Sequence, residues 1–434
     1  MGELSLPLIA HLQVWLASIL VVSIVLMLIR AWKVAEVYWI IAGVILLLLL
    51  RLESLSNALG AAAKGTDVYL FLTGMMLLSE LASKHGVFDW LAAVRHADGS
   101  SARLFLLVYG AGTLVTIFMS NDATAVVMTP AIVVAVRKAR IDPLPYLFVC
   151  AFIANAASFV LPISNPANLV VFQKQMPALV PWLVRFGIPS IFSIVVTYAV
   201  LRWYFRKRLQ ARIDSAIANH MLDHRGKMML AGLLATAAVL LMASALNWDL
   251  GLPTFLTALV FTAIVSLSSK SSPIPLFREI SWSTLALVAG LFVMVDTVER
   301  YGAMRYTQKW LEWASNLGAT AGALLIGCVV AVANNLVNNL PLGLIASSSL
   351  APAHGRGLIA SAVLIGVDLG PNLSITGSLA TILWLIALRK QKLDVSFGDF
   401  LRIGAICMPA ALLVSLLGAI SARALFGPAG LSHY

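Results

Sequence analysis

A pattern of apolar segments broken by polar residues occurs twice in this chain, at a displacement of 216 or 217 residues. The segment 72–80 matches 288–296 (288 − 72 = 216), and the doublet 121–122 matches 338–339 (338 − 121 = 217). The paired residues include Gly74 with Gly290, Glu80 with Asp296, Asn121 with Asn338, and Asp122 with Asn339. A duplicated hydrophobic chain with matching interruptions in each half is typical of secondary transporters, whose site lies where the two halves meet.

The composition excludes an ordinary soluble protein. Hydrophobic residues make up 60% of the chain, charged residues 11%, and the mean hydropathy is +0.93, whereas soluble domains carry about 25% charged residues. Apolar stretches of roughly 20 residues, long enough to cross a bilayer as helices, recur along the chain. Because a helix satisfies its own backbone groups in lipid, we expect an all-α polytopic membrane protein and not a soluble enzyme.

The segments divide into two repeats, 1–203 and 228–434, joined by a basic linker at 204–227. We expect five spans and one re-entrant hairpin in each repeat, hence about ten transmembrane helices, two hairpins and two broken helices. The first repeat is predicted to contain spans 8–29, 37–52, 67–83 and 182–203, hairpin 103–136 and broken span 143–176. The second is predicted to contain spans 228–246, 253–269, 283–298 and 403–425, hairpin 318–351 and broken span 358–388. Residues 8–29 lack a basic region and a cleavage site before them, which favours a retained span over a signal peptide.

An odd number of spans per repeat requires the two halves to insert with opposite orientation. With the N-terminus outside, 21 of the 30 Lys and Arg residues fall in inner segments, 8 fall outside and one, Arg185, lies within a span. This bias agrees with the positive-inside rule. We therefore expect an inverted repeat in the inner membrane, with both termini periplasmic and the linker cytoplasmic. The net charge of +11 is explained by topology, and no nucleic-acid partner is expected.

Four carboxylates fall inside predicted spans, where ionisable groups are costly and are functional candidates. Glu80 and Asp296 lie near the ends of their spans, and pairing with Lys84 and Arg300, four residues on, is the structural alternative. Asp122 is predicted to lie at a hairpin tip, where it either caps the following helical arm or binds a solute hydroxyl or a proton. Asp368 lies between weak points of a broken helix. Because burial disfavours the charged form of a carboxylate, it is a candidate proton carrier.

Neutral polar residues gather around the same interruptions and supply hydrogen-bond donors and acceptors. Satisfaction of the broken-helix backbone is the structural alternative for most of them. The expected solute-binding residues are Asn121, Asp122, Thr124, Ser164, Asn165, Asn168, Asn338, Asn339, Asp368, Thr376, Gly377 and Ser378, with Asp122 and Asp368 coupling to protons. No cofactor or metal site is expected, and the three separated cysteines are interpreted as small apolar residues.

Two segments, SNDATAVVMTP at 120–130 and GVDLGPNLSITGSLATILWL at 366–385, resemble signature segments of the ArsB arsenite efflux permeases in the ArsB/NhaD group of ion transporters. The resemblance extends over nearly the whole chain. It implies export of arsenite, and usually antimonite, driven by the proton gradient, with a soluble ATPase as partner in some members. The sequence departs from that pattern at Leu342, where Thr is expected, and at 372–374, where Lys-Ile-Thr is usual.

The chemistry of the interruptions agrees with this resemblance. Arsenous acid is neutral near pH 7, so its site requires Asn, Ser, Thr and Asp and not an Arg clamp. The sequence therefore favours a proton-coupled arsenite antiporter that works by alternating access. An Na⁺/H⁺ antiporter on the same scaffold is the main alternative, followed by an organic-anion symporter. A membrane-embedded enzyme or a passive scaffold is a further alternative from a different class.

Overall fold

The computed structural model describes residues 6–29, 34–92, 100–173, 176–210, 223–269, 272–302, 304–350 and 357–427. These residues form α-helices joined by short turns, 3₁₀ segments and one π-helical segment. The large apolar side chains exposed on many helices suit contact with lipid, which the polytopic prediction requires.

The helices of the first half follow one another in the order that the apolar segments predict. They are α1 (Leu6–Ile29), α2 (Glu36–Leu49), α3 (Leu55–Ala63), α4 (Thr66–Lys84), α5 (Val87–Ala92), α6 (Ser101–Phe118), α7 (Thr129–Lys138), α8 (Leu144–Ala156), α9 (Pro166–Phe172) and α10 (Leu179–Phe205). Ser54 and Ser100 cap α3 and α6 by accepting a backbone N–H bond.

The second half contains a matching series. Its helices are α11 (His224–Ala245), α12 (Gly251–Ser269), α13 (Ile274–Glu279), α14 (Trp282–Arg300), α15 (Arg305–Asn316), α16 (Ala319–Val337), α17 (Asn339–Leu350), α18 (Leu358–Leu369), α19 (Leu379–Lys390) and α20 (Phe397–Phe426). Most of the predicted linker, residues 211–222, lies outside the described residues.

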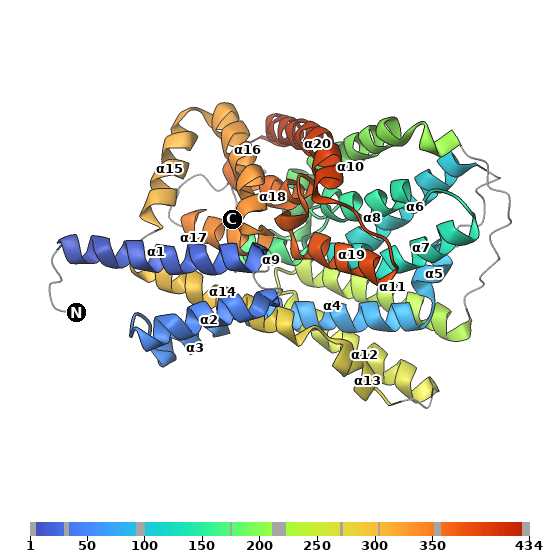
Figure 1. Ribbon diagram of the computed structural model, residues 1–434, viewed down its shortest axis with the longest axis horizontal. Helices are drawn as coiled ribbons and strands as arrows, with labels where there is room; N and C mark the ends of the chain where they lie inside the picture. Colours follow the sequence, from blue (N-terminus) through green and yellow to red (C-terminus); the bar gives the residue numbers. More distant parts are fainter. Residues whose placement is uncertain are drawn as a thin grey trace.

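Two layers make up the molecule (Figure 1). One layer contains α6, α8, α10, α16, α18 and α20, and the other contains α1 to α4 and α11 to α14. Helices α9 and α17 connect the two layers, because α9 contacts α4 and α18, and α17 contacts α14 and α16. Helices α6 and α7 lie toward one end of the long axis and α16 and α17 toward the other (Figure 1).

Close helix packing stabilises the layer that contains α16 and α18. A Cβ added to Gly366 on α18 would lie 2.7 Å from the Gly327 carbonyl oxygen on α16, so only glycine permits this approach. Small residues of this kind allow helices to associate in lipid, where the hydrophobic effect between them is absent. Phe148, Phe152, Trp384 and Phe400 fill the space between α8, α19 and α20 with ring centroids 5.1–6.0 Å apart.

Seven helices in the described residues are long and apolar enough to cross a bilayer: α6, α10, α11, α12, α14, α16 and α20. The predicted spans at 8–29, 37–52 and 67–83 are not among them, whereas α6 and α16, the first arms of the predicted hairpins, are. Helix α2 ends at Leu49, before a turn in which Arg51 has φ +54°, and α4 carries Asp67, Glu80 and Lys84. The last span is longer than predicted, because α20 continues through Pro409 over 30 residues.

Candidate functional site

At the first tip, between α6 and the segment Ala123–Met128, Asp122 does not cap the following helical segment as one of the two hypotheses proposed. Asp122 has helical backbone angles and its side chain accepts no capping hydrogen bond. Ser120 instead accepts a bond of 3.4 Å from the backbone N–H of Ala123. Asn121 is 2% exposed and its Oδ1 atom has no hydrogen-bond partner in the described chain. The Asp122 carboxylate is therefore left available to a ligand.

The second tip is a sharp reversal at Asn338. Its φ of +78° and ψ of +154° lie in a region that glycine favours and that strains other residues. This residue separates α16 from α17, so Asn334 and Asn335 belong to a different helix from Asn339. The Nδ2 atom of Asn338 donates to the Thr376 carbonyl oxygen (3.2 Å), which joins this tip to the second broken span.

Both broken spans place a polar cap at the restart of the helix. Asn165 accepts the Ala167 N–H through Oδ1 (3.0 Å) at the start of α9, where Pro166 has no N–H that would need an acceptor. Ser378 accepts the Thr381 N–H (3.1 Å) at the start of α19. Structural capping, the alternative considered for these residues, is thus part of their role.

Asp368 is the most enclosed carboxylate of the site. It is fully buried at the end of α18, and its Oδ1 atom accepts a hydrogen bond of 2.7 Å from Nδ2 of Asn165. Its Oδ2 atom is buried without a hydrogen-bond partner in the described residues. This contact joins the two broken spans, and it brings together two residues that the sequence placed 203 positions apart. One oxygen is held and the other is free to exchange a proton or to bind a donor.

Gly377 keeps the second break compact. A Cβ at this position would lie 2.5 Å from Cα of Pro371 and 2.8 Å from Oδ1 of Asn335. Thr376 donates through Oγ1 to the Asn335 carbonyl oxygen (3.0 Å), and Asn335 donates to the Gly370 carbonyl oxygen (3.0 Å). The break is therefore a packed, hydrogen-bonded turn that only glycine fits.

Thr124, Ser164 and Asn168 have structural partners within the first repeat. The hydroxyls of Thr124 and Thr116 are 2.8 Å apart, and Ser164 donates to the Ile117 carbonyl oxygen (3.0 Å). Asn168 donates through Nδ2 to carbonyl oxygens of the first break, at 2.9 Å for Ser158. These side chains satisfy interrupted backbone, as the structural alternative proposed.

Asn155, which the sequence interpretation did not single out, pairs with Asn372. Nδ2 of Asn155 donates to Oδ1 of Asn372 (2.9 Å), and Nδ2 of Asn372 donates to the Phe152 carbonyl oxygen (3.1 Å). The two residues are 217 positions apart (372 − 155 = 217), and no local spacing in the sequence points to their contact.

Unpaired hydrogen-bond acceptors concentrate at these tips and breaks. Buried oxygens without a partner in the described residues include Oδ1 of Asn121, Asn155, Asn168, Asn334 and Asn339, and Oδ2 of Asp368. An unsatisfied buried acceptor costs free energy until a donor or a cation reaches it. The set suits a solute that donates hydrogen bonds, and it offers little to an anion.

A cavity of about 160 Å³ opens onto the first tip, and we call it the α4 cavity. It is lined by Leu72, Met75, Met76, Ser79, Glu80, Ser120, Asp122, Ala123, Val127, Pro166, Glu279, Ser281, Thr284, Leu379 and Leu383. Pro166 and Leu379 are the residues that follow the caps Asn165 and Ser378. One open space therefore reaches the first tip and the restart of both broken helices. Asn338, at the second tip, lines a pocket of only about 10 Å³.

A second cavity of about 150 Å³, the α14 cavity, is lined by Lys64, Gln173, Phe292, Val295, Asp296, Glu299, Leu344, Ser347 and Ser348. Phe292, Val295 and Asp296 correspond to Met76, Ser79 and Glu80 of the α4 cavity (296 − 80 = 216). The two cavities thus use equivalent positions of α4 and α14. No residue of either tip or break lines the α14 cavity.

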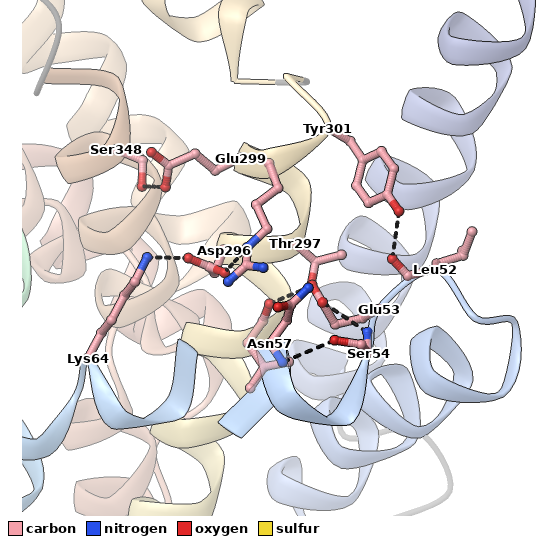
Figure 2. Close-up of polar contacts among 12 residues, drawn as sticks. Leu52, Glu53, Ser54, Asn57, Lys64, Asp296, Thr297, Glu299, Tyr301 and Ser348 are labelled. Carbon is pink, nitrogen blue, oxygen red and sulfur yellow. Dashed lines mark hydrogen bonds and ion pairs between the residues drawn. The ribbon is translucent and has the colours of Figure 1, made fainter. Parts of the chain in front are cut away.

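The carboxylates at these equivalent positions differ in their partners. Asp296 is ion-paired with Lys64 and with Arg300, whose Nε atom lies 2.7 Å from Oδ2 (Figure 2). The predicted pairing of Asp296 with Arg300 is confirmed. In the described chain Glu80 forms no ion pair with Lys84, although the two charges interact.

Comparisons with known proteins identify relatives along most of the chain. A family model described as "Citrate transporter" (CitMHS) matches residues 9–367. The "Arsenical pump membrane protein" of Escherichia coli K12 is 27% identical over 370 residues, covering 79% of this chain and 83% of that protein. The "Putative arsenical pump membrane protein" of Bacillus subtilis is 24% identical over 407 residues, covering 86% and 91%. The predicted relationship to arsenite efflux permeases is confirmed.

A solved structure supports the fold. The YdaH transporter of Alcanivorax borkumensis superposes with a TM-score of 0.59 at 16% sequence identity, covering 86% of this chain and 88% of that one. At this identity the likeness concerns the fold alone, and it supports a polytopic helical transporter architecture.

Proposed function

The chain belongs to the citrate transporter (CitMHS) family of membrane transporters, and we propose that it exports arsenite, and antimonite, from the cytoplasm in exchange for protons. The observation that carries this proposal is the state of Asp368. This carboxylate is fully buried at the contact of the two broken spans, with one oxygen held by Asn165 and the other unpaired. A buried carboxylate with one free oxygen is suited to carry a proton through the membrane.

The charges of the residues that line the α4 cavity favour a neutral solute. The described residues that line the α4 cavity include three carboxylates and three serines but neither Lys nor Arg. Arsenous acid is neutral near pH 7 and presents hydroxyl donors, which match the unpaired acceptors at the tips and breaks. The names of the curated relatives agree with this substrate, and they do not favour the Na⁺/H⁺ antiporter.

We propose that the two halves form an inverted repeat with re-entrant hairpins α6–α7 and α16–α17. The matching order of helices and the opposite placement of the hairpins along the long axis (Figure 1) support this arrangement. The basic residues near the end of α10 favour a cytoplasmic position for that end of the molecule, and hence periplasmic termini. Under this topology the α4 cavity faces the cytoplasm, where arsenite would enter.

Everted membrane vesicles test the proposal. As(III) uptake should follow an imposed proton gradient, acid inside, and should collapse when a protonophore is added. Vesicles without the protein provide the control. As(III) uptake that ignores the gradient would exclude proton coupling, and no As(III) uptake under any gradient would exclude arsenite as the substrate.

A further inference from the structure

The α4 cavity concentrates negative charge, and no lysine or arginine lines it, although the charge of Lys84 reaches Glu80 from outside the lining. Glu80 on α4, Glu279 at the end of α13 and Asp122 at the first tip all line it. None of the three carboxylates forms an ion pair or a hydrogen bond with another described residue, and Glu80 and Glu279 interact as like charges. They come from three separate elements, so the fold assembles this charge at the cavity.

A hydroxyl in the same cavity is available to a solute. Ser79 is 8% exposed and lines the cavity one residue before Glu80. It forms no hydrogen bond within the described part of the chain. A buried hydroxyl without a protein partner must bond to something that enters the cavity. The Ser79 hydroxyl can donate and accept a hydrogen bond, and it lies beside carboxylates that form no ion pair.

In the α14 cavity, the carboxylate at the position equivalent to Glu80 is neutralised by cations. Asp296, the equivalent of Glu80, lies between Lys64 and Arg300, and Glu299 accepts a hydrogen bond of 2.9 Å from Ser348 (Figure 2). Val295 replaces Ser79 there. The negative α4 cavity is therefore not a general consequence of the repeat, because the other copy neutralises its carboxylate.

We propose that Glu80 and Glu279 determine the charge class of the solute: they exclude anions such as citrate from the α4 cavity and admit neutral hydroxylated solutes. An anion that enters meets like charges from three separate elements, and their repulsions add. A neutral solute meets no such repulsion. Specificity by repulsion of the wrong ligand is a common device in binding sites. The inference rests on the proposed function in taking arsenous acid as the neutral solute, and it separates this chain from family members that carry tricarboxylates.

Charge reversal at Glu279 tests the proposal. Glu279 is exposed and unpaired, so Glu279→Lys should fold, and it gives the α4 cavity a lysine such as the α14 cavity has in Lys64. Glu312→Lys is the matched control, because Glu312 is exposed on α15 and lines neither cavity. Glu279→Gln, which removes charge without reversing it, should have a smaller effect in the same direction.

The first measurement is As(III) uptake into proteoliposomes with and without citrate. Citrate should change uptake by less than about twofold in the unsubstituted protein and in Glu312→Lys, and should reduce it at least about fivefold in Glu279→Lys. The KM for As(III) should change by less than about threefold, because a neutral solute does not respond to the reversed charge. Equal competition by citrate in all three proteins would overturn the proposal.

A second measurement separates this inference from the proposed function. Citrate should raise the melting temperature of purified Glu279→Lys and leave that of the unsubstituted protein unchanged. If the unsubstituted protein transports no As(III), arsenite export is wrong, but the melting result still tests anion exclusion. Stabilisation of the unsubstituted protein by citrate would contradict the charge assignment whatever the transported solute is.

Discussion

The α4 and α14 cavities are lined by equivalent positions of α4 and α14, yet they differ in charge and in the polar segments to which they extend. The α4 cavity contains unpaired carboxylates and extends to Asp122 and to the starts of α9 and α19. The α14 cavity contains Asp296 between two cations and reaches no tip or break. The second tip, at Asn338, opens only into a pocket of about 10 Å³.

This difference shows which part of the repeat is symmetric. The two cavities are lined at equivalent positions of α4 and α14. Their side chains differ, since one cavity reaches the polar breaks, whereas ion pairs and the bond from Ser348 to Glu299 lie at the other. Under the alternating-access mechanism that we propose, this structure is the state in which the breaks are reached from the α4 side.

The largest effect is expected at Asp368, where the two broken spans meet. Asp368→Asn keeps the size of the side chain and can still accept the bond from Asn165, but it cannot carry a proton. Gradient-driven As(III) transport should fall by about 100-fold or more. Vesicle uptake measures this, and Asp394→Asn, at an exposed ion pair with Arg389, should leave transport unchanged.

The next prediction compares the equivalent carboxylates by stability. Asp296→Ala leaves Lys64 and Arg300 without their shared partner. Because these cations are 55% and 39% exposed, we expect a loss of about 1–2 kcal/mol, less than for a fully buried pair. Glu80→Ala breaks no pair, and its effect should stay within about 0.5 kcal/mol. Equilibrium unfolding of both variants in detergent measures the difference, and equal losses would contradict the comparison.

The smallest effect concerns the bond from Ser348 on α17 to Glu299 on α14, two residues that line the α14 cavity. Ser348→Ala removes the donor to Glu299 and should favour separation of the two helices, a wider opening of the cavity, by about 0.5–1 kcal/mol, a population change of about two- to fivefold. The labelling rate of Ser347→Cys, a lining position, reports this opening. Ser361→Ala, which loses only a bond to Gly357 within α18, should not change that rate. An unchanged rate in Ser348→Ala would mean that the bond does not limit this opening.

Much of this architecture can be predicted from the sequence, because apolar length, charge bias and Pro or Gly interruptions act locally. The helix breaks at 156–166 and 369–379 follow from such residues. The partner of a side chain cannot be predicted in this way. Glu80 and Asp296 have the same i + 4 cation spacing, yet only Asp296 forms ion pairs, with Arg300 and also with Lys64, which follows α3.

The bond from Asn165 to Asp368 likewise depends on how two distant breaks pack. The helix ends align Asp368 with Asn155 (369 − 156 = 213 and 368 − 155 = 213). The repeat displacement changes from 217 at the tips to 213 at these breaks, and a single displacement cannot capture it.

Cysteine accessibility tests alternating access between the two cavities most directly. Met76→Cys in the α4 cavity and Ser347→Cys in the α14 cavity would be placed, one at a time, in a protein lacking Cys150, Cys328 and Cys407. Each would be labelled with a membrane-impermeant maleimide in everted and in right-side-out vesicles. We predict labelling of Met76→Cys only in everted vesicles and of Ser347→Cys only in right-side-out vesicles. Any pH gradient or As(III) concentration that raises one rate should lower the other. Labelling of both positions from one side, or parallel changes in the two rates, would contradict the account.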